Sequence, residues 1–159
     1  STAALAVELA VYNRSKGKTI IDHLHDIYAR FGFFDEILIS KIFEGEEGKK
    51  QIADLMSNLR NNPPNSFGGQ RLVELRDYQD GSIIADGVTK REVINLPGSN
   101  VLQFQLESGV FSARPSGTEP KIKFYVSCWT EPGLPLKEAR EITLNRIGKV
   151  KTDIETLIN

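Results

Sequence analysis

The chain contains very little cysteine and no long apolar run. Cys128 is the single cysteine among 159 residues, which excludes an intramolecular disulfide and a cysteine-based metal cluster. No apolar stretch approaches the roughly 20 residues of a membrane-spanning helix, and residues 1–10 lack the basic start of a signal peptide. The formal net charge of −1 indicates neither nucleic-acid nor anionic-membrane binding. We therefore expect a cytoplasmic protein with no nucleic-acid or membrane partner.

Histidine is also scarce, and the clustered acids do not indicate a metal site. His23 and His25 are two positions apart, so they point to different sides of a helix and are interpreted as surface or hydrogen-bonded residues. Segment 44–48 holds three glutamates and two glycines, which favours a solvated helix entrance over a cation site. Cys128 lies in an apolar strand pattern and is interpreted as a small core residue rather than a nucleophile.

The N-terminal part of the chain has helical patterns. Residues 3–12 are rich in Ala and Leu and apolar almost all round, which predicts a buried helix and suggests a piece of something larger. Thr19 with Asp22 three residues later is typical of a helix start, and Gly32 is placed to end that helix. Residues 33–43 fit either a strand or an extended linker.

The rest of the chain alternates between helix and strand patterns. Helices are predicted over residues 47–60 and 135–158, and strands over residues 71–78, 101–107, 110–114 and 121–129. Residues 82–96 are expected to hold a short strand and a loop, with turn signals at Asp80-Gly81 and Asp86-Gly87. Sequential hairpins between helices predict the α+β class, with a mainly antiparallel sheet of about four strands covered by helices. The domain proper is expected to begin near Lys41.

Two of these strands flank a loop with the composition of an anion site. Its sequence is Arg114-Pro115-Ser116-Gly117-Thr118-Glu119-Pro120. Two prolines and a glycine fix the shape of such a turn. An arginine offers a fork of donors that matches a phosphate, hydroxyls add further donors, and a glycine lets the backbone approach a ligand closely.

The loop and its charged neighbours can be interpreted either as an anion site or as an ordinary hairpin turn. Lys121 and Lys123 add positive charge, and Lys123 shares a side of its strand with Tyr125. Glu119 would repel a phosphate, so we expect it to face away and brace a neighbouring cation. The alternative is a tight hairpin loop with an incidental arginine, since such loops are common.

Residues 114–125 resemble the phosphate-binding loop of the α-D-phosphohexomutase superfamily, over a length far more specific than a short motif. Residues 17–28 resemble the helical end of that family's third domain, and residues 43–60 resemble the entry to its fourth. The likeness covers the whole chain. It is closest to the phosphoglucomutase and phosphomannomutase branch, because Lys-Ile-Lys-Phe-Tyr follows the loop.

The resemblance implies a division of the chain and a set of site residues. Residues 1–40 would be the C-terminal helices of the preceding, third mutase domain. Residues 41–159 would be the C-terminal phosphate-binding domain. The positions that would hold the non-reacting phosphate of the substrate are Arg114, Ser116, Gly117, Thr118 and, as a weaker candidate, Lys123.

The resemblance also implies a reaction for the full-length protein. Phosphoryl groups would move between an enzyme serine and the C1 and C6 oxygens of glucose or mannose phosphate, assisted by Mg²⁺. No match to the family's catalytic serine, metal loop or sugar-recognition loop is found here; Asp77, Asp80 and Asp86 lie in turns and do not fit the metal loop. We therefore expect this fragment to be inactive and to bind no cofactor. Its partners would be a hexose phosphate and the remaining mutase domains of the same chain.

Two alternatives remain open. One is a stand-alone module that binds a sugar phosphate or another anion without catalysis. The other is the corresponding domain of a phosphopentomutase or a phosphoglucosamine mutase.

Overall fold

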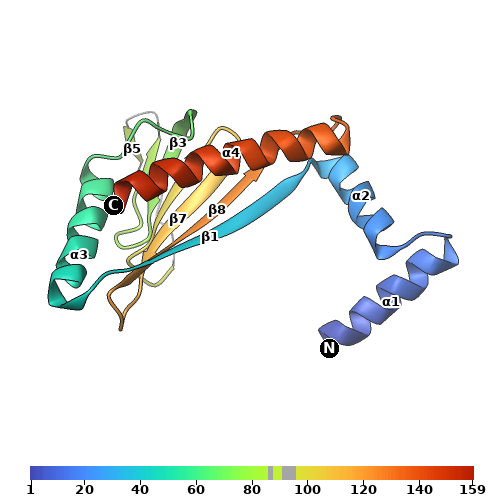
Figure 1. Ribbon diagram of the computed structural model, residues 1–159, viewed down its shortest axis with the longest axis horizontal. Coiled ribbons are helices and arrows are strands. Elements are labelled where there is room, and N and C mark those ends of the chain that lie inside the picture. Colours follow the sequence, from blue (N-terminus) through green and yellow to red (C-terminus); the bar gives the residue numbers. More distant parts are fainter. Residues whose placement is uncertain (86–87, 91–95) are drawn as a thin grey trace. The chain divides into compact units, whose positions relative to one another are not determined.

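The computed structural model describes residues 1–85, 88–90 and 96–159 (Figure 1). The expected turn at Asp86-Gly87 and most of the loop expected within 82–96 lie outside these residues. The elements in chain order are α1 (Thr2–Ser15), α2 (Ile20–Phe31), β1 (Phe34–Ile42), α3 (Gly45–Asn61), β2 (Ser66–Phe67), β3 (Gln70–Asp77), β4 (Ile83–Ala85), β5 (Val88–Lys90), β6 (Leu102–Leu106), β7 (Gly109–Pro115), β8 (Lys121–Trp129) and α4 (Leu136–Leu157).

The chain divides into two compact units. The first contains Ser1–Phe34 and Trp129–Thr143, and the second contains Asp35–Cys128 and Leu144–Asn159. The second unit holds nearly all of the sheet and the loop singled out in the sequence. No helix in the described ranges combines the length and apolar character needed to cross a membrane.

The sheet is antiparallel and larger than predicted. Its strands follow the order β1-β8-β7-β6-β3-β4-β5, and β2 pairs with β3 outside this path. Helices and an antiparallel sheet confirm the α+β class, but the sheet has eight strands within the described ranges rather than about four. The extra strands include β2, with two residues, and β4 and β5, with three each, which are too short to show a periodic pattern.

One face of the sheet carries the hydrophobic core. The alternation predicted for two strands is confirmed, because alternate residues of β6 and β8 are buried. In the core, these buried strand residues pack against residues of α3 and α4, so both helices lie on this face of the sheet. The core members from β6, β8, α3 and α4 include Leu102, Phe104, Leu106, Ile122, Phe124, Val126, Cys128, Ile52, Met56, Leu59, Ile147, Val150 and Ile154. Phe104 stacks on Phe111 with ring centroids 4.4 Å apart.

The residues between these core positions project from the opposite face, which we call the open face. Its central members on β6, β7 and β8 are Gln103, Ser112, Arg114, Lys123 and Tyr125. Cross-strand pairing sets their neighbours: Ser112 lies opposite Tyr125, and Arg114 lies opposite Lys123. The open face therefore gathers polar and charged side chains along the central hairpin.

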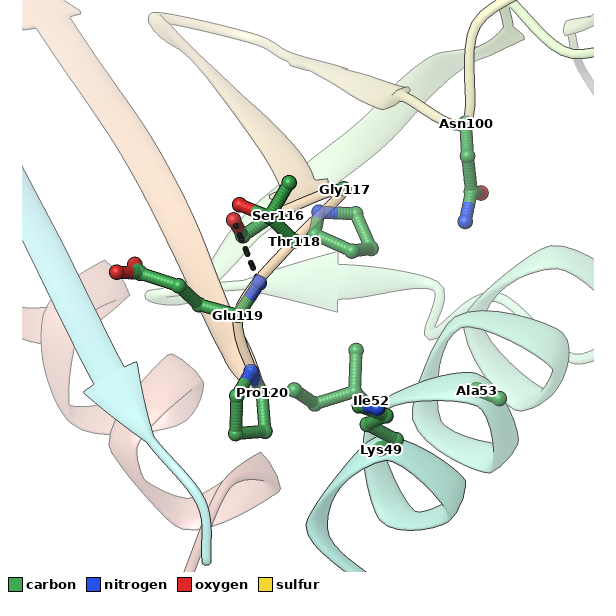
Figure 2. A pocket seen from close by; sticks show the side chains of 10 residues that line it. Lys49, Ile52, Ala53, Asn100, Ser116, Gly117, Thr118, Glu119 and Pro120 are labelled. Atoms are coloured by element: carbon green, nitrogen blue, oxygen red, sulfur yellow. Dashed lines mark hydrogen bonds between the residues drawn. The ribbon is translucent and has the colours of Figure 1, made fainter. Parts of the chain in front are cut away.

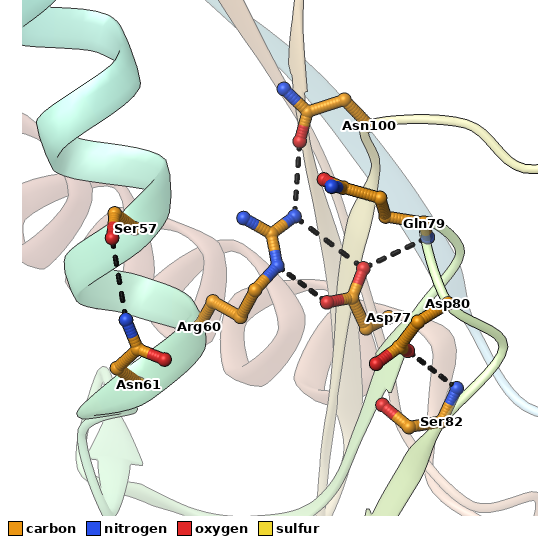
Figure 3. Close-up of polar contacts among 8 residues, drawn as sticks. All are labelled: Ser57, Arg60, Asn61, Asp77, Gln79, Asp80, Ser82 and Asn100. Carbon is orange, nitrogen blue, oxygen red and sulfur yellow. Dashed lines mark hydrogen bonds and ion pairs between the residues drawn. The ribbon is translucent and has the colours of Figure 1, made fainter.

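A polar cluster fastens the end of α3 to the sheet (Figure 3). The Arg60 guanidinium donates through Nε and Nη2 to the carboxylate of Asp77, at the end of β3. The same Nη2 donates to the Asn100 side-chain oxygen over 3.0 Å. Asp77 also accepts from the Gln79 backbone N–H over 2.9 Å, so this almost fully buried carboxylate has a donor on more than one side.

In the first unit, the boundaries of α2 agree with the sequence. Thr19 caps α2 in a capping box with Asp22, as predicted. Gly32 ends the helix with a φ of 92°, and a Cβ there would lie 1.8 Å from the Thr130 carbonyl oxygen. Only glycine fits this position without moving the backbone.

The predicted burial of the first helix is wrong. Helix α1 forms where expected, but its apolar side chains are solvent-exposed; Leu5, for example, is 66% exposed. The composition indicated burial because an all-round apolar helix normally lies in a core, whereas this one presents apolar surface to its surroundings.

Candidate functional site

The loop singled out in the sequence connects β7 to β8 and is closed by short-range hydrogen bonds. The Ser116 N–H donates to the Lys121 carbonyl over 2.8 Å, and the Lys121 N–H donates to the Glu119 carbonyl over 2.8 Å. The Glu119 N–H donates to the Ser116 hydroxyl over 3.3 Å (Figure 2). These bonds explain the fixed turn that the two prolines predicted.

Arg114 and Lys123 stand side by side at the end of the hairpin that carries the loop. They are cross-strand partners, and both project from the open face because their neighbours Ala113 and Phe124 are buried in the core. Arg114 is exposed and Lys123 is partly exposed. Among the described residues, neither side chain has a hydrogen bond or an ion pair. Two cations thus face each other without a carboxylate between them.

The loop also borders a cavity of about 310 Å³ (Figure 2). Its walls are the loop from Pro115 to Pro120, one face of α3, and Asn100. From α3 it receives Lys49, Ile52 and Ala53. The structure therefore brings Ser116, Gly117 and Thr118 to this cavity, while Arg114 and Lys123 are not among its lining residues.

The backbone conformation at position 117 does not itself require a glycine. It has no positive φ, and a Cβ at this position would meet nothing within 4 Å. In the described part of the chain, neither its N–H nor that of Thr118 has an acceptor. The backbone here is consequently open to an external group.

The position of Glu119 differs from expectation in one respect. Figure 2 shows its carboxylate pointing away from Asn100 and from α3, which agrees with the expected orientation. Within the described ranges, however, this carboxylate forms no ion pair, so the expected bracing of a neighbouring cation is absent there. The Glu119 side chain is exposed to solvent.

Two cavity residues were not singled out as site residues from the sequence. Lys49 forms an exposed ion pair with Glu46, and Asn100 accepts from Arg60. Each lies far from the loop in sequence, and the resemblance of residues 43–60 gave Lys49 no role in the site. Only the tertiary structure brings them to the loop.

The described residues contain no group of three or more His, Cys, Asp or Glu side chains able to hold a metal ion. Cys128 is fully buried, and this burial raises the pKa of its thiol. A neutral thiol in a core has little nucleophilic character, in agreement with the interpretation of Cys128 as a core residue.

Comparison with known proteins identifies relatives of the chain. No protein-family model matches the chain. The chain is 39% identical over 114 residues to a phosphoglucomutase of Staphylococcus haemolyticus (strain JCSC1435), which covers 72% of this chain and 21% of the relative. It is 39% identical over 122 residues to a phosphoglucomutase of Staphylococcus aureus (strain MSSA476), covering 77% of this chain and 21% of the relative. A phosphoglucomutase of S. aureus (strain USA300) is 40% identical over the same length.

These relatives confirm the family resemblance found in the sequence. The chain is a phosphohexomutase-family domain. More narrowly, it is related to phosphoglucomutases over about three quarters of its length, as a C-terminal portion of such a protein would be. The chain spans about a fifth of the length of the relatives it matches.

Proposed function

We propose that residues 41–159 bind the non-reacting phosphate of a hexose phosphate, with glucose or mannose as the sugar. The observation that supports this most directly is the cross-strand pair of Arg114 and Lys123 beside the loop. Like charges directly opposite on adjacent strands destabilise a sheet. A phosphate between them would convert this repulsion into two charge-assisted contacts.

The loop can supply the remaining donors. The N–H groups of Gly117 and Thr118 are open, and the absent side chain at Gly117 leaves room for a ligand. Ser116 and Thr118 carry hydroxyls, and Arg114 can present two parallel donors to one phosphate. This set of donors favours an anion-binding loop over the alternative of a hairpin with an incidental arginine.

The whole protein that contains this domain would be a phosphoglucomutase or phosphomannomutase. Phosphoryl transfer depends mainly on positioning and charge neutralisation. Anchoring one phosphate here would place the far end of the sugar at a catalytic serine on another domain. Mg²⁺ would be held by residues outside this chain. Residues 1–40 would be the C-terminal helices of the preceding domain, and the exposed apolar side chains of α1 and α2 support this assignment.

The decisive experiment is Arg114→Ala in the full-length enzyme. Losing a charge-assisted phosphate contact should lower kcat/KM by an amount equivalent to about 2–4 kcal/mol. Ser116→Ala and Thr118→Ala should each cost less, because they remove neutral donors. Arg140→Ala, at an exposed arginine of α4, is the matched control. If kcat/KM of Arg114→Ala stays within about threefold of wild type, the assigned role of Arg114 is wrong.

A second experiment distinguishes a domain of an enzyme from a stand-alone binding module. A single loop with a few contacts should bind only in the millimolar range once the cost of association is included. Titration of this chain with glucose 6-phosphate, followed by NMR, measures that affinity. Micromolar binding would favour the stand-alone module. Conversion of glucose 1-phosphate to glucose 6-phosphate by this chain alone would contradict the expected inactivity.

A further inference from the structure

We propose that a hollow on the open face, next to Arg114 and Lys123, receives the sugar ring, with Tyr125 as its platform and Ser112 as a donor to a sugar hydroxyl. This inference rests on the proposed phosphate site, because it concerns the remainder of the same ligand. It assigns part of sugar recognition to the domain itself.

The spacing along the strands fits a hexose phosphate. Ser112 lies two residues from Arg114 on β7, and its cross-strand partner Tyr125 lies two residues from Lys123 on β8. Residues two apart on a strand project from the same face and are separated by about 6.8 Å. A phosphate at the cation pair therefore places an attached ring over Ser112 and Tyr125.

The hollow has the size and chemistry that a sugar ring requires. Its volume is about 420 Å³, and its side chains come from β1, β7 and β8, including Glu36, Leu38, Val110, Ser112, Tyr125 and Ser127. Apolar and polar groups are mixed, as in small-ligand sites generally. A sugar ring offers apolar C–H faces and a rim of hydroxyls. The Tyr125 ring, 43% exposed, can cover a C–H face, and the hydroxyl and carboxylate groups can meet the rim.

A chain of hydrogen bonds sets the direction in which Ser112 can donate. The Gln103 side-chain oxygen accepts from the Tyr78 hydroxyl over 3.2 Å and from the Gln105 amide nitrogen over 3.1 Å. The nitrogen of Gln103 must then face the other way, and it donates to the Ser112 hydroxyl oxygen over 3.4 Å. Because Gln103 supplies a donor to this oxygen, the Ser112 O–H proton is left for an acceptor in the hollow. Gln103 is thus a positioning residue for Ser112.

The test compares two probes, glucose 6-phosphate and inorganic phosphate, by NMR titration of the isotope-labelled chain. The native chain should bind glucose 6-phosphate more tightly than inorganic phosphate. Ser112→Ala and Tyr125→Ala should each weaken glucose 6-phosphate binding about fivefold, as expected for one net hydrogen bond or one ring contact. Both variants should leave phosphate binding unchanged. Tyr125→Phe should retain native affinity, because it keeps the platform, and Tyr12→Ala is the control at an exposed tyrosine elsewhere.

The positioning role of Gln103 has its own test. In Gln103→Glu the carboxylate accepts from Ser112, which turns the hydroxyl proton away from the hollow. This variant should bind glucose 6-phosphate as weakly as Ser112→Ala, and the double variant should be no weaker than Ser112→Ala alone. A purely structural effect of Gln103 would instead add to that of Ser112→Ala and would overturn its role.

The outcomes separate this inference from the phosphate assignment. If Arg114→Ala weakens both probes while Ser112→Ala and Tyr125→Ala change neither, the phosphate site stands and the sugar subsite is refuted. Equal weakening of both probes by Ser112→Ala and Tyr125→Ala also refutes it, since the sugar would not be the group contacted. If Arg114→Ala leaves both probes unaffected, or if neither probe shifts the Gly117 and Thr118 amides at millimolar concentration, the phosphate site fails and the subsite fails with it. Dispersed amide spectra of each variant establish that it is folded.

Discussion

Removing one partner of the ion pair between Arg60 and Asp77 should strongly destabilise the second unit. The Asp77 side chain is 6% exposed and that of Arg60 is 26% exposed, so Arg60→Ala leaves a nearly buried carboxylate without its cation. Removing one partner of a buried pair costs about 3–5 kcal/mol. We expect the lower end, about 3 kcal/mol, because the Gln79 N–H still donates to Asp77 and water reaches the partly exposed side of the pair.

Urea unfolding followed by circular dichroism measures this free energy. In thermal unfolding, the same loss should lower Tm by about 6–12 °C for a protein of this length. The double variant Arg60→Ala/Asp77→Ala should be less destabilised than the sum of the single variants by at least about 1 kcal/mol. Lys49→Ala breaks a solvent-exposed pair with Glu46 and should cost less than about 1 kcal/mol. A cost below about 1 kcal/mol for Arg60→Ala, or additive single effects, would refute the reasoning.

Three further outcomes can be checked independently. Gly68→Ala should destabilise the fold by more than about 2 kcal/mol in urea unfolding, because Gly68 has a φ of 59° and a Cβ there would lie 2.7 Å from Val150. Near-native stability of this variant would contradict the close contact. Gly117→Ala should leave the unfolding free energy unchanged but weaken phosphate binding in an NMR titration, since the added methyl group meets only the space left for a ligand. Hydrogen bonds from the Thr19 hydroxyl and N–H lower the pKa of the Asp22 carboxyl. The ionised carboxylate therefore stabilises α2 above its unfolded pKa, and this stabilisation is lost as the pH falls through the lowered pKa. In Thr19→Val, an NMR titration of the carboxyl groups should show the pKa of Asp22 moving up toward its ordinary value.

Much of the fold could be predicted because its signals are local. The alternation around Phe104 and Phe124, the cap at Thr19 and the helix end at Gly32 depend on residues close in sequence, and all are confirmed. The strand over 71–78 also formed, although Leu72 and Leu75 break strict alternation. The structure explains this irregularity by a shift of register against β6 between Leu72 and Glu74, where a bulge lets both leucines contact the core.

The remaining features depend on contacts that sequence patterns do not encode. The exposure of Leu5 depends on which parts of the protein pack against α1. The composition of α1 indicates only that its side chains are apolar, and it does not say whether a partner covers them. The strand pairing that brings Arg114 opposite Lys123 is a property of register, and the motif alone indicated two basic residues near one loop. Asn100 lines the cavity and accepts a hydrogen bond from Arg60, a contact between residues 40 positions apart in sequence. The position and the closed turn of the loop were therefore predictable, while the residues that surround it in space were not.

The arrangement of α4 has a consequence for how the domain folds as it is made. Val150 and Ile154 are fully buried against strands that precede them in the chain, and the Gly68 N–H donates to Asp153 over 2.6 Å. Edge strand β1 cannot pair with its neighbour in the sheet until β8 has been made; next to these strands, the Phe43 N–H donates to the Pro120 carbonyl. Contacts between residues so distant in sequence form slowly. During translation, the sheet cannot be completed before β8 has left the ribosome. Part of its apolar face stays uncovered until α4 follows, and during that interval it is exposed to aggregation and to chaperones.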